Sequence, residues 1–186
     1  MARPLLILIT GLPCTGKTAL GKRLAKEFSL PFISKDDVKE SLFNTLGWKD
    51  REWSKKIGAA SYNILYYLTE SLFESQTSFI IESKFKPEAD TVRFQTYITK
   101  YGFQLLQILC ETEGKVLFER FKTRSESGDR HPGHVDHHNY DEFKETLLYG
   151  RAAQLDITGS FLQIDTTNFA SIDYDQIYTE IHKNLT

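Results

Sequence analysis

The sequence feature that most restricts the fold is the octapeptide GLPCTGKT at residues 11–18. An apolar, β-prone run at residues 5–9 precedes it, and the segment after it spaces Leu20, Leu24 and Phe28 four residues apart on one helical face. Glycine at both ends of such a loop lets its backbone amides wrap phosphate oxygens at a helix N-terminus. The sequence therefore predicts a strand, a phosphate-binding loop and a helix, in that order.

The residues of this loop differ in their expected chemistry. Lys17 would place a positive charge on the β- and γ-phosphate oxygens, and Thr18 offers a hydroxyl to a bridging Mg²⁺. Cys14 is either a redox-sensitive thiol, because a helix N-terminus lowers a thiol pKa, or a small residue that fills the loop. The predicted contacts to the nucleotide come from Gly11, Pro13, Cys14, Thr15, Gly16, Lys17 and Thr18.

Beyond the loop, β-prone runs alternate with amphipathic segments. The other expected strands are residues 31–34, 78–81, 103–109 and 161–164, and the expected helices are residues 17–28, 36–46, 53–73, 87–101, 115–123 and 174–183. This alternation favours a parallel sheet with helices on both faces. We expect a three-layer α/β fold of the P-loop NTPase class with a five-stranded parallel sheet, formed by residues 1–186 as one domain with a lid segment at 120–140.

Charge and cysteine content restrict the class of partner and the compartment. The 186 residues carry a formal net charge of -2, which gives no global attraction to nucleic acid but does not exclude a local basic groove. No apolar run approaches the roughly 20 residues of a membrane-spanning helix, so no membrane association is expected. The two cysteines, Cys14 and Cys110, imply no disulfide framework. We expect a cytoplasmic protein, and nothing in the sequence sets its oligomeric state.

Three carboxylates follow predicted strands, at the sheet edge where open α/β sheets bind ligands. Asp36 is the candidate general base that orients or deprotonates an acceptor hydroxyl, or that holds a water on Mg²⁺. Asp36 or Asp37 could instead cap the following helix. Glu82 could reach the Mg²⁺ shell through water or a substrate hydroxyl, and a solvated strand-end charge is the alternative.

Three arginines toward the C-terminal part of the chain are candidates for contact with the nucleotide. Arg120 and Arg124 lie one helical turn apart, and Arg130 follows in a glycine-containing stretch. Arginines that reach the triphosphate from a closing lid stabilise transition-state charge and exclude water. We therefore expect all three to bind the nucleotide, with catalytic roles for Arg120 and Arg124. Simple surface arginines are the alternative.

Several histidines lie in the same stretch. His131 and His134 are candidates for substrate contact, because lid residues of such enzymes face the acceptor. Zinc binding together with His137 and His138 is an alternative, although no strong metal signature surrounds them. Solvated loop histidines are the third possibility.

Taken together, these motifs make the chain similar to the small P-loop kinases, a superfamily that includes phage polynucleotide kinase, chloramphenicol phosphotransferase, zeta-toxin and gluconate kinases. GLPCTGKT resembles their phosphate loop, and Asp36-Asp37 resembles an Asp-Asp pair whose first member is the catalytic base. The resemblance implies a small-molecule or nucleic-acid hydroxyl as acceptor. It places on the acceptor side Lys39, Glu82, Ser83 and Lys84, and in the lid Arg120 and Arg124.

Two residues depart from the polynucleotide kinase pattern. Lys39 stands where that enzyme has an arginine that could fork onto a phosphate, and Lys84 stands where it has an asparagine. The RHPGH stretch at residues 130–134 instead resembles a group of bacterial predicted ATP-dependent kinases whose acceptors are undefined. These departures favour a small-molecule acceptor over nucleic acid.

The sequence thus predicts an ATP- and Mg²⁺-dependent kinase that transfers the γ-phosphate to a hydroxyl group of a small-molecule acceptor. Two alternatives stay open: a 5'-hydroxyl polynucleotide kinase, and a regulatory switch that binds ATP to reposition its lid without transferring phosphate. No motif distinguishes adenine from guanine, and the identity of the acceptor is not fixed by fold analogy.

Overall fold

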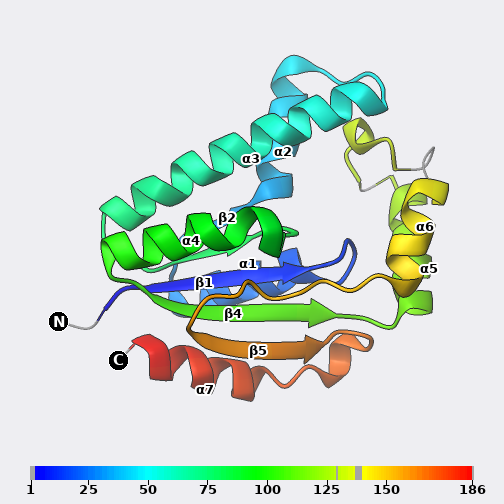
Figure 1. The fold of residues 1–186 in the computed structure, drawn as a ribbon. Helices are drawn as coiled ribbons and strands as arrows, with labels where there is room; N and C mark the ends of the chain where they lie inside the picture. The colour runs from blue at the N-terminus through cyan, green and yellow to red at the C-terminus, as the bar shows by residue number, and fades with distance from the viewer. Residues whose placement is uncertain (1–2, 129, 137–139, 186) are drawn as a thin grey trace.

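A computed structural model describes residues 3–128, 130–136 and 140–185 and has three layers (Figure 1). The middle layer is a wholly parallel sheet with the strand order β2-β3-β1-β4-β5. Its strands are β1 (Leu5–Gly11), β2 (Phe32–Ser34), β3 (Phe79–Glu82), β4 (Gln104–Glu111) and β5 (Ser160–Asp165). The predicted α/β fold with a five-stranded parallel sheet is confirmed.

Helices cover both faces of this sheet. The outer layers contain α1 (Lys17–Phe28) and α7 (Tyr174–Leu185) on one face, and α3 (Arg51–Glu74) and α4 (Pro87–Tyr101) on the other. Successive side chains of a strand point to opposite faces, so β1 contributes to both cores. Leu6 and Leu8 pack in the cluster under α3 and α4. Leu5, Ile7 and Ile9 pack in the cluster with α1 and α7. All seven residues of β1 are buried, as expected for a central parallel strand.

The remaining helices lie beyond the carboxyl ends of the strands, opposite the two chain termini (Figure 1). They are α2 (Lys35–Leu46), α5 (Gly114–Glu126), η1 (Pro132–His134), α6 (Tyr140–Tyr149) and η3 (Phe169–Ser171). Helix α6 lies between residues 123 and 161, where the sequence predicted neither a helix nor a strand. It forms because Phe143 and Leu147, spaced one turn apart, pack against Phe121 of α5. His137 and His138, within the expected lid, lie outside the described residues.

The N-terminus of α2 differs from the prediction that Asp36 or Asp37 caps it. Ser34 is the N-cap, and its hydroxyl accepts a hydrogen bond from the Asp37 amide at 3.5 Å. Both aspartates already belong to the first turn, where Asp37 makes an exposed ion pair with Lys22 at 3.3 Å. The Asp36 carboxylate is therefore not used as a cap.

The first turn of α3 also begins earlier than predicted. Asp50 caps it by accepting a hydrogen bond from the Trp53 amide at 2.8 Å, so the helix starts at Arg51 rather than at residue 53. The 24 residues of α3 make it the longest helix in the described ranges. None of the helices in those ranges combines the length and apolar character needed to cross a membrane.

Candidate active site

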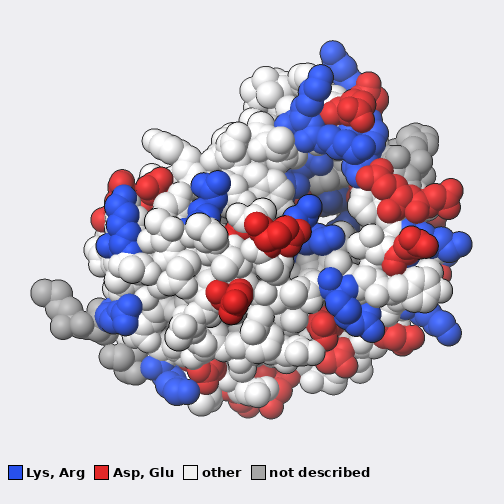
Figure 2. All heavy atoms as spheres, viewed as in Figure 1, with Lys and Arg blue, Asp and Glu red and all other residues white. Residues whose placement is uncertain are grey.

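A cavity of about 550 Å³ opens at the carboxyl edge of the sheet, and Figure 2 shows the hollow with lysine and arginine side chains around it. Its lining contains nine Lys and Arg residues against three Asp and Glu residues. The cations are Lys17, Lys35, Lys39, Arg51, Lys55, Lys84, Arg120, Arg124 and Arg130, and the acids are Asp36, Glu82 and Asp136. On a chain of net charge -2, this concentration of cations makes the cavity attractive to anions.

The phosphate loop forms one wall of this cavity. Gly11, Cys14 and Gly16 all have positive φ angles, of 151°, 68° and 82°, which turn the backbone sharply before α1. A Cβ at Gly11 would collide with the Cys110 carbonyl oxygen. Lys17 is 8% exposed, and its ammonium group donates a hydrogen bond to the Leu12 carbonyl at 2.9 Å and lies 3.7 Å from the Glu82 carboxylate. The loop thus combines a strained backbone with a lysine ammonium group beside it, the two features that a phosphate-binding loop requires.

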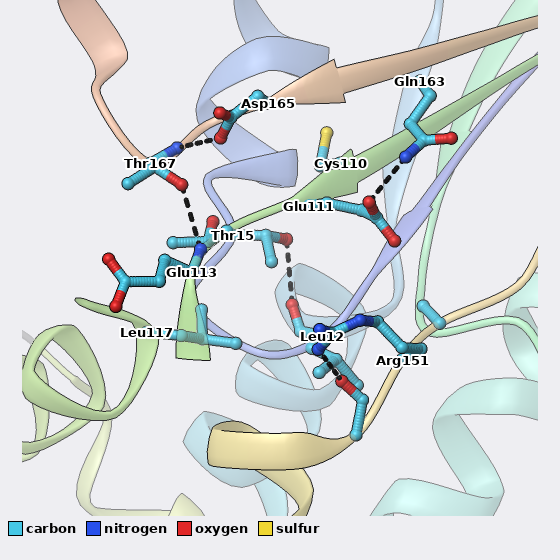
Figure 3. A pocket seen from close by; sticks show the side chains of 13 residues that line it. Leu12, Thr15, Cys110, Glu111, Glu113, Leu117, Arg151, Gln163, Asp165 and Thr167 are labelled. Carbon is cyan, nitrogen blue, oxygen red and sulfur yellow. Dashed lines mark hydrogen bonds between the residues drawn. The ribbon is translucent and has the colours of Figure 1, made fainter. Parts of the chain in front are cut away.

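Thr15 faces away from this cavity. Its hydroxyl donates to the Leu12 carbonyl at 2.9 Å and lines a second cavity of about 520 Å³ on the other side of the loop (Figure 3). The two cavities share no lining residue. The side chain of Thr15 is therefore directed away from the predicted nucleotide site, and its backbone amide donates to the Leu12 carbonyl at 3.4 Å.

Cys14 lines the main cavity, but it lacks the lowered pKa of a reactive thiol. Burial raises the pKa of Cys14, and the nearby cations Arg124, Arg130 and Lys17 oppose this only in part. The raised pKa gives no support to the alternative that Cys14 is a redox-sensitive thiol. Cys14 occupies a position in the loop where the backbone is left-handed, with a φ angle of 68°.

Three side-chain oxygens meet beside the loop. Glu82 is 5% exposed and accepts hydrogen bonds from the Thr18 hydroxyl at 3.0 Å and from the Ser34 hydroxyl at 2.8 Å. The sheet register causes this meeting, because Glu82 at the end of β3 pairs with Ser34 on β2 and with Ile9 on β1. Hydroxyl and carboxylate oxygens are the ligands Mg²⁺ prefers. No group of three or more His, Cys, Asp or Glu in the described ranges could hold a metal, so phosphate oxygens and water would have to complete its shell.

Asp36 also lines the cavity and lies in the first turn of α2. Its carboxylate accepts a hydrogen bond from Arg130 at 3.0 Å and pairs with Lys35 at 3.2 Å. Burial opposes its ionisation, yet the charges of Lys35 and Arg130 hold the pKa of Asp36 well below its usual range. The group is a carboxylate at neutral pH and accepts rather than donates hydrogen bonds.

The segment 130–136 is docked on α2. Arg130 pairs with Asp36, with Glu40 at 3.2 Å and with Asp136 at 3.3 Å. His134 is 3% exposed, and its ring nitrogens lie 2.9 Å from the Glu40 carboxylate and 2.9 Å from the Arg130 guanidinium. Burial lowers the pKa of His134, although the hydrogen bond to Glu40 opposes this. His134 lines the cavity as predicted, while its ring holds Arg130 and Glu40 in place.

His131, the other predicted substrate contact, is not at the cavity. Its ring stacks on Phe43 with centroids 5.2 Å apart and lies edge-on to Trp48 at 5.0 Å. Its Nε2 lies 3.2 Å from the Asn44 side-chain oxygen. The aromatic surface of α2 holds this ring, so the structure gives His131 a docking role instead of an acceptor contact.

The two arginines of α5 differ in the groups that their guanidinium groups contact. Arg120 donates to the carbonyls of Thr166 and Thr167, both at 2.8 Å, and lies 3.9 Å above the Phe169 ring. It lines the cavity but is committed to the segment after β5, which the sequence pattern did not indicate. Arg124 has a buried Nε with no hydrogen-bond partner in the described structure, and its Nη2 is 3.7 Å from Asp136. Unlike Arg120, Arg124 is not committed to backbone carbonyls, and its side chain lines the cavity.

The predicted acceptor-side residues line the same cavity. Lys39 donates to the Ser54 hydroxyl at 2.9 Å. Ser83 donates to the Tyr62 hydroxyl at 3.0 Å, and that hydroxyl donates to the Lys84 carbonyl at 3.1 Å. The Lys84 ammonium makes no ion pair with any described residue, and burial together with the charges of Lys86 and Lys17 lowers its pKa.

Comparisons with known proteins now identify the family. Residues 6–148 match the AAA domain family. The chain is also 38% identical to a candidate kinase from Chloroflexus aurantiacus, with 99% of this chain and 100% of that chain covered and a TM-score of 0.89. The chain belongs to the AAA domain family of small P-loop kinases. The predicted membership of this superfamily is confirmed.

Two more distant structures share the P-loop kinase fold. A sugar kinase from Janibacter is 13% identical, with 100% of this chain and 95% of that chain covered and a TM-score of 0.50. A protein of the PezAT toxin-antitoxin system of Streptococcus pneumoniae is 16% identical, with 94% and 72% covered and a TM-score of 0.52. No protein of curated function matches the sequence.

Sequence reasoning missed one wall of this P-loop kinase cavity. The first half of α3 contributes Arg51, Ser54, Lys55, Gly58 and Tyr62 to the lining. A signal was present, because these residues recur every three or four positions and so share one helical face. The helix was predicted only as a cover for the sheet, since its apolar face is the stronger pattern.

Proposed function

We propose that the protein is an ATP- and Mg²⁺-dependent kinase that transfers the γ-phosphate to a hydroxyl group of a small molecule. One observation carries this proposal: a single cavity has the phosphate loop with Lys17 on one wall and the ionised Asp36 on another. Phosphoryl transfer depends mainly on positioning and on charge stabilisation. A donor cradle and an acceptor carboxylate in one cavity provide both.

On the donor side, the loop amides and Lys17 would hold the phosphates, and the guanidinium of Arg124, which lines the cavity, would add a charged donor. Thr18 and Glu82 would hold Mg²⁺, directly or through water. Bound Mg²⁺ supplies neutralisation of the charge that develops on the phosphates. Glu82 also keeps the Thr18 hydroxyl oriented toward this position.

On the acceptor side, Asp36 would accept a hydrogen bond from the substrate hydroxyl and orient its oxygen toward the γ-phosphorus. Its depressed pKa makes it a weak base. This suits a loose transition state, in which the hydroxyl proton is lost late and orientation contributes more than proton abstraction. Ser83 and Lys84 form the neighbouring wall.

The segment 120–140 would act as the lid of one domain that spans residues 1–186. Its docking on α2 through Arg130 and His134 would help to close the cavity over bound substrates and exclude water. Exclusion of water favours transfer to an acceptor over ATP hydrolysis. The free thiols of Cys14 and Cys110 fit the reducing cytoplasm expected for such an enzyme.

A phosphorylation screen with γ-labelled ATP, Mg²⁺ and a library of hydroxylated metabolites tests the proposed function. We expect label on at least one small molecule, with Lys17→Met reducing transfer by about 10²-fold or more, the loss seen when a charge-stabilising donor is removed. Nucleotide binding with no transfer to any compound would favour the switch. Labelling of a 5'-hydroxyl oligonucleotide, with steep salt dependence of its binding, would favour the polynucleotide kinase.

A further inference from the structure

The acceptor half of the cavity contains a buried ammonium group that no carboxylate neutralises. Lys39 is 6% exposed, and its Nζ donates to the Ser54 hydroxyl at 2.9 Å. No Asp or Glu carboxylate oxygen of the described residues lies within 4.0 Å of this Nζ, the limit for an ion pair. Burying an unpaired charge costs free energy, and buried charges are ordinarily paired or bound to ligands. Lys39 thus has no ion-paired carboxylate among the described residues, and an anion bound in the cavity would supply one.

Lys39 points into the gap between two helices of the acceptor side. It lies one turn after Asp36 on α2, so the two residues share a helical face. Its Nζ lies 3.8 Å from the point that a Cβ at Gly58 of α3 would occupy, and 5.2 Å from the centroid of the Phe43 ring. Packing against Gly58 and Phe43 fixes the ammonium group beside the predicted acceptor carboxylate.

Two neighbouring cations of this half already have acidic partners, whereas Lys84 has no ion pair among the described residues. Lys35 pairs with Asp36 at 3.2 Å. Arg51 pairs with both carboxylate oxygens of Glu142, with the shorter distance 2.6 Å. These cations add positive potential around Lys39 without neutralising it. Burial, and to a lesser extent the charge of Lys35, lowers the pKa of Lys39 to about 8, as expected for a buried ammonium group without an ion-paired partner.

From this arrangement we infer that the phosphate acceptor is itself an anion, a hydroxyl compound whose carboxylate or phosphate group binds the Lys39 ammonium while its hydroxyl faces Asp36. This inference rests on the proposed function, because it names the substrate class of the same site. The anionic group would form a charge-assisted hydrogen bond with Lys39. A neutral polyol would leave the buried ammonium unpaired and would be rejected for that reason.

Binding measurements test this without requiring turnover. The protein is saturated with Mg²⁺ and a non-hydrolysable ATP analogue, so that anions cannot occupy the donor phosphate positions. Calorimetric titrations then compare glycerol with glycerate and glycerol 3-phosphate, and glucose with glucuronate and glucose 6-phosphate, with sulfate as the smallest anion. We expect the anionic members of at least one series to bind about 10- to 100-fold more tightly than the neutral member, the usual strength of a hydrogen bond to a charged group.

Variants separate Lys39 from the rest of the basic cavity. Lys39→Met should abolish the preference for anions, and Lys39→Arg should keep most of it because the charge is retained. Lys56→Met removes an exposed lysine of α3 that does not line the cavity, and it should change nothing. A preference limited to carboxylates or limited to phosphates identifies which group the site takes.

Two results would overturn the inference: equal binding of neutral and anionic members, including no binding of any anion, or an unchanged preference in Lys39→Met. Failure of the proposed function gives a different result. In that case the anions and the ATP analogue bind, but ATP transfers no phosphate to any compound that binds. Transfer to a neutral polyol would instead support the proposed function and contradict this inference.

Discussion

The guanidinium of Arg130 lies 3.0 Å from the carboxylate of Asp36. This contact joins the segment 130–136 to the first turn of α2, and it occurs at the cavity that also contains the phosphate loop. Arg130 is 15% exposed at its side chain, whereas the Asp36 side chain is 37% exposed. The pair therefore couples the position of the lid segment to the charge state of the proposed acceptor carboxylate.

Removal of this arginine should change the pH dependence of the enzyme. The pKa of Asp36 lies well below its usual range because Lys35 and Arg130 outweigh its burial. The ion pair between Asp36 and Arg130 contributes to the free energy of unfolding at pH values above the pKa of Asp36 in the unfolded chain, about 3.9. This contribution is lost as the pH falls through the lower pKa of Asp36 in the folded protein. In Arg130→Met the pKa of Asp36 should rise, so the acid limb of kcat/KM should move to higher pH. Arg130→Lys is the control that keeps the charge, and an unmoved acid limb in Arg130→Met would contradict the coupling.

Docking of the lid segment should depend on the absence of a side chain at Gly133. A Cβ there would lie 2.6 Å from atoms of the Phe43 ring, which also stacks on His131 and contacts His134 edge-on. Gly133→Ala should cost about 1–3 kcal/mol of docking, as overpacking does, and should lower kcat by about 5- to 100-fold. The fold should survive, because the segment lies outside the main cores. Hydrogen exchange of residues 130–136 should increase, and unchanged exchange with unchanged kcat would show that the segment accommodates the methyl group.

Much of the fold could be predicted from the sequence, because apolar periodicity reports local structure directly. The run at residues 5–9 and the loop after it predicted β1 and the start of α1 without tertiary information. The aspartate pair after β2 could be placed at the ligand edge by topology alone. Its relation to Arg130 could not be predicted, since 94 residues separate the two partners in the chain.

The site details that could not be predicted are set by tertiary contacts. Arg120 donates hydrogen bonds to backbone carbonyls after β5. The pattern of side chains in a sequence does not indicate where backbone carbonyl groups point in the fold. His131 was grouped with His134 by sequence, but a 3-10 turn directs one ring to the outer surface of α2 and the other to the cavity. Helix propensity likewise could not show that Lys39 lacks an acidic partner.

Glu82 should determine the dependence of the enzyme on Mg²⁺. It is held by the hydroxyls of Thr18 and Ser34, and glutamine could still accept both hydrogen bonds while losing the negative charge. Glu82→Gln should therefore fold normally but weaken Mg²⁺ activation by about 10- to 100-fold, as changes around metal ligands do. Mg²⁺ titration of activity measures this, with thermal unfolding as the control for folding. A Mg²⁺ dependence equal to that of the wild type would remove Glu82 from the metal site.

The acceptor KM should rise in alkaline solution while kcat stays constant. The pKa of Lys39 is about 8, since burial and the cations Lys35, Arg130 and Arg51 lower it more than Asp36 raises it. The protonated form binds an anion, so KM should be constant below about pH 7 and increase as pH rises through 8. Without ligand, stability should instead increase from about pH 8 to 10, because the unfolded chain binds more protons there. In Lys39→Arg the KM should be flat over this range, and a flat profile in the wild type would contradict the role of Lys39.

The central claim is that Asp36 and the phosphate loop form the two halves of one transfer site. The most direct test is Asp36→Asn, which keeps the shape of the side chain but removes its charge. We expect ATP affinity, measured by calorimetry, to stay within about two-fold, because the loop and Arg124 are untouched, while phosphate transfer falls by about 10²-fold or more. Transfer at the wild-type rate, or a loss of ATP binding as large as the loss of transfer, would contradict this account.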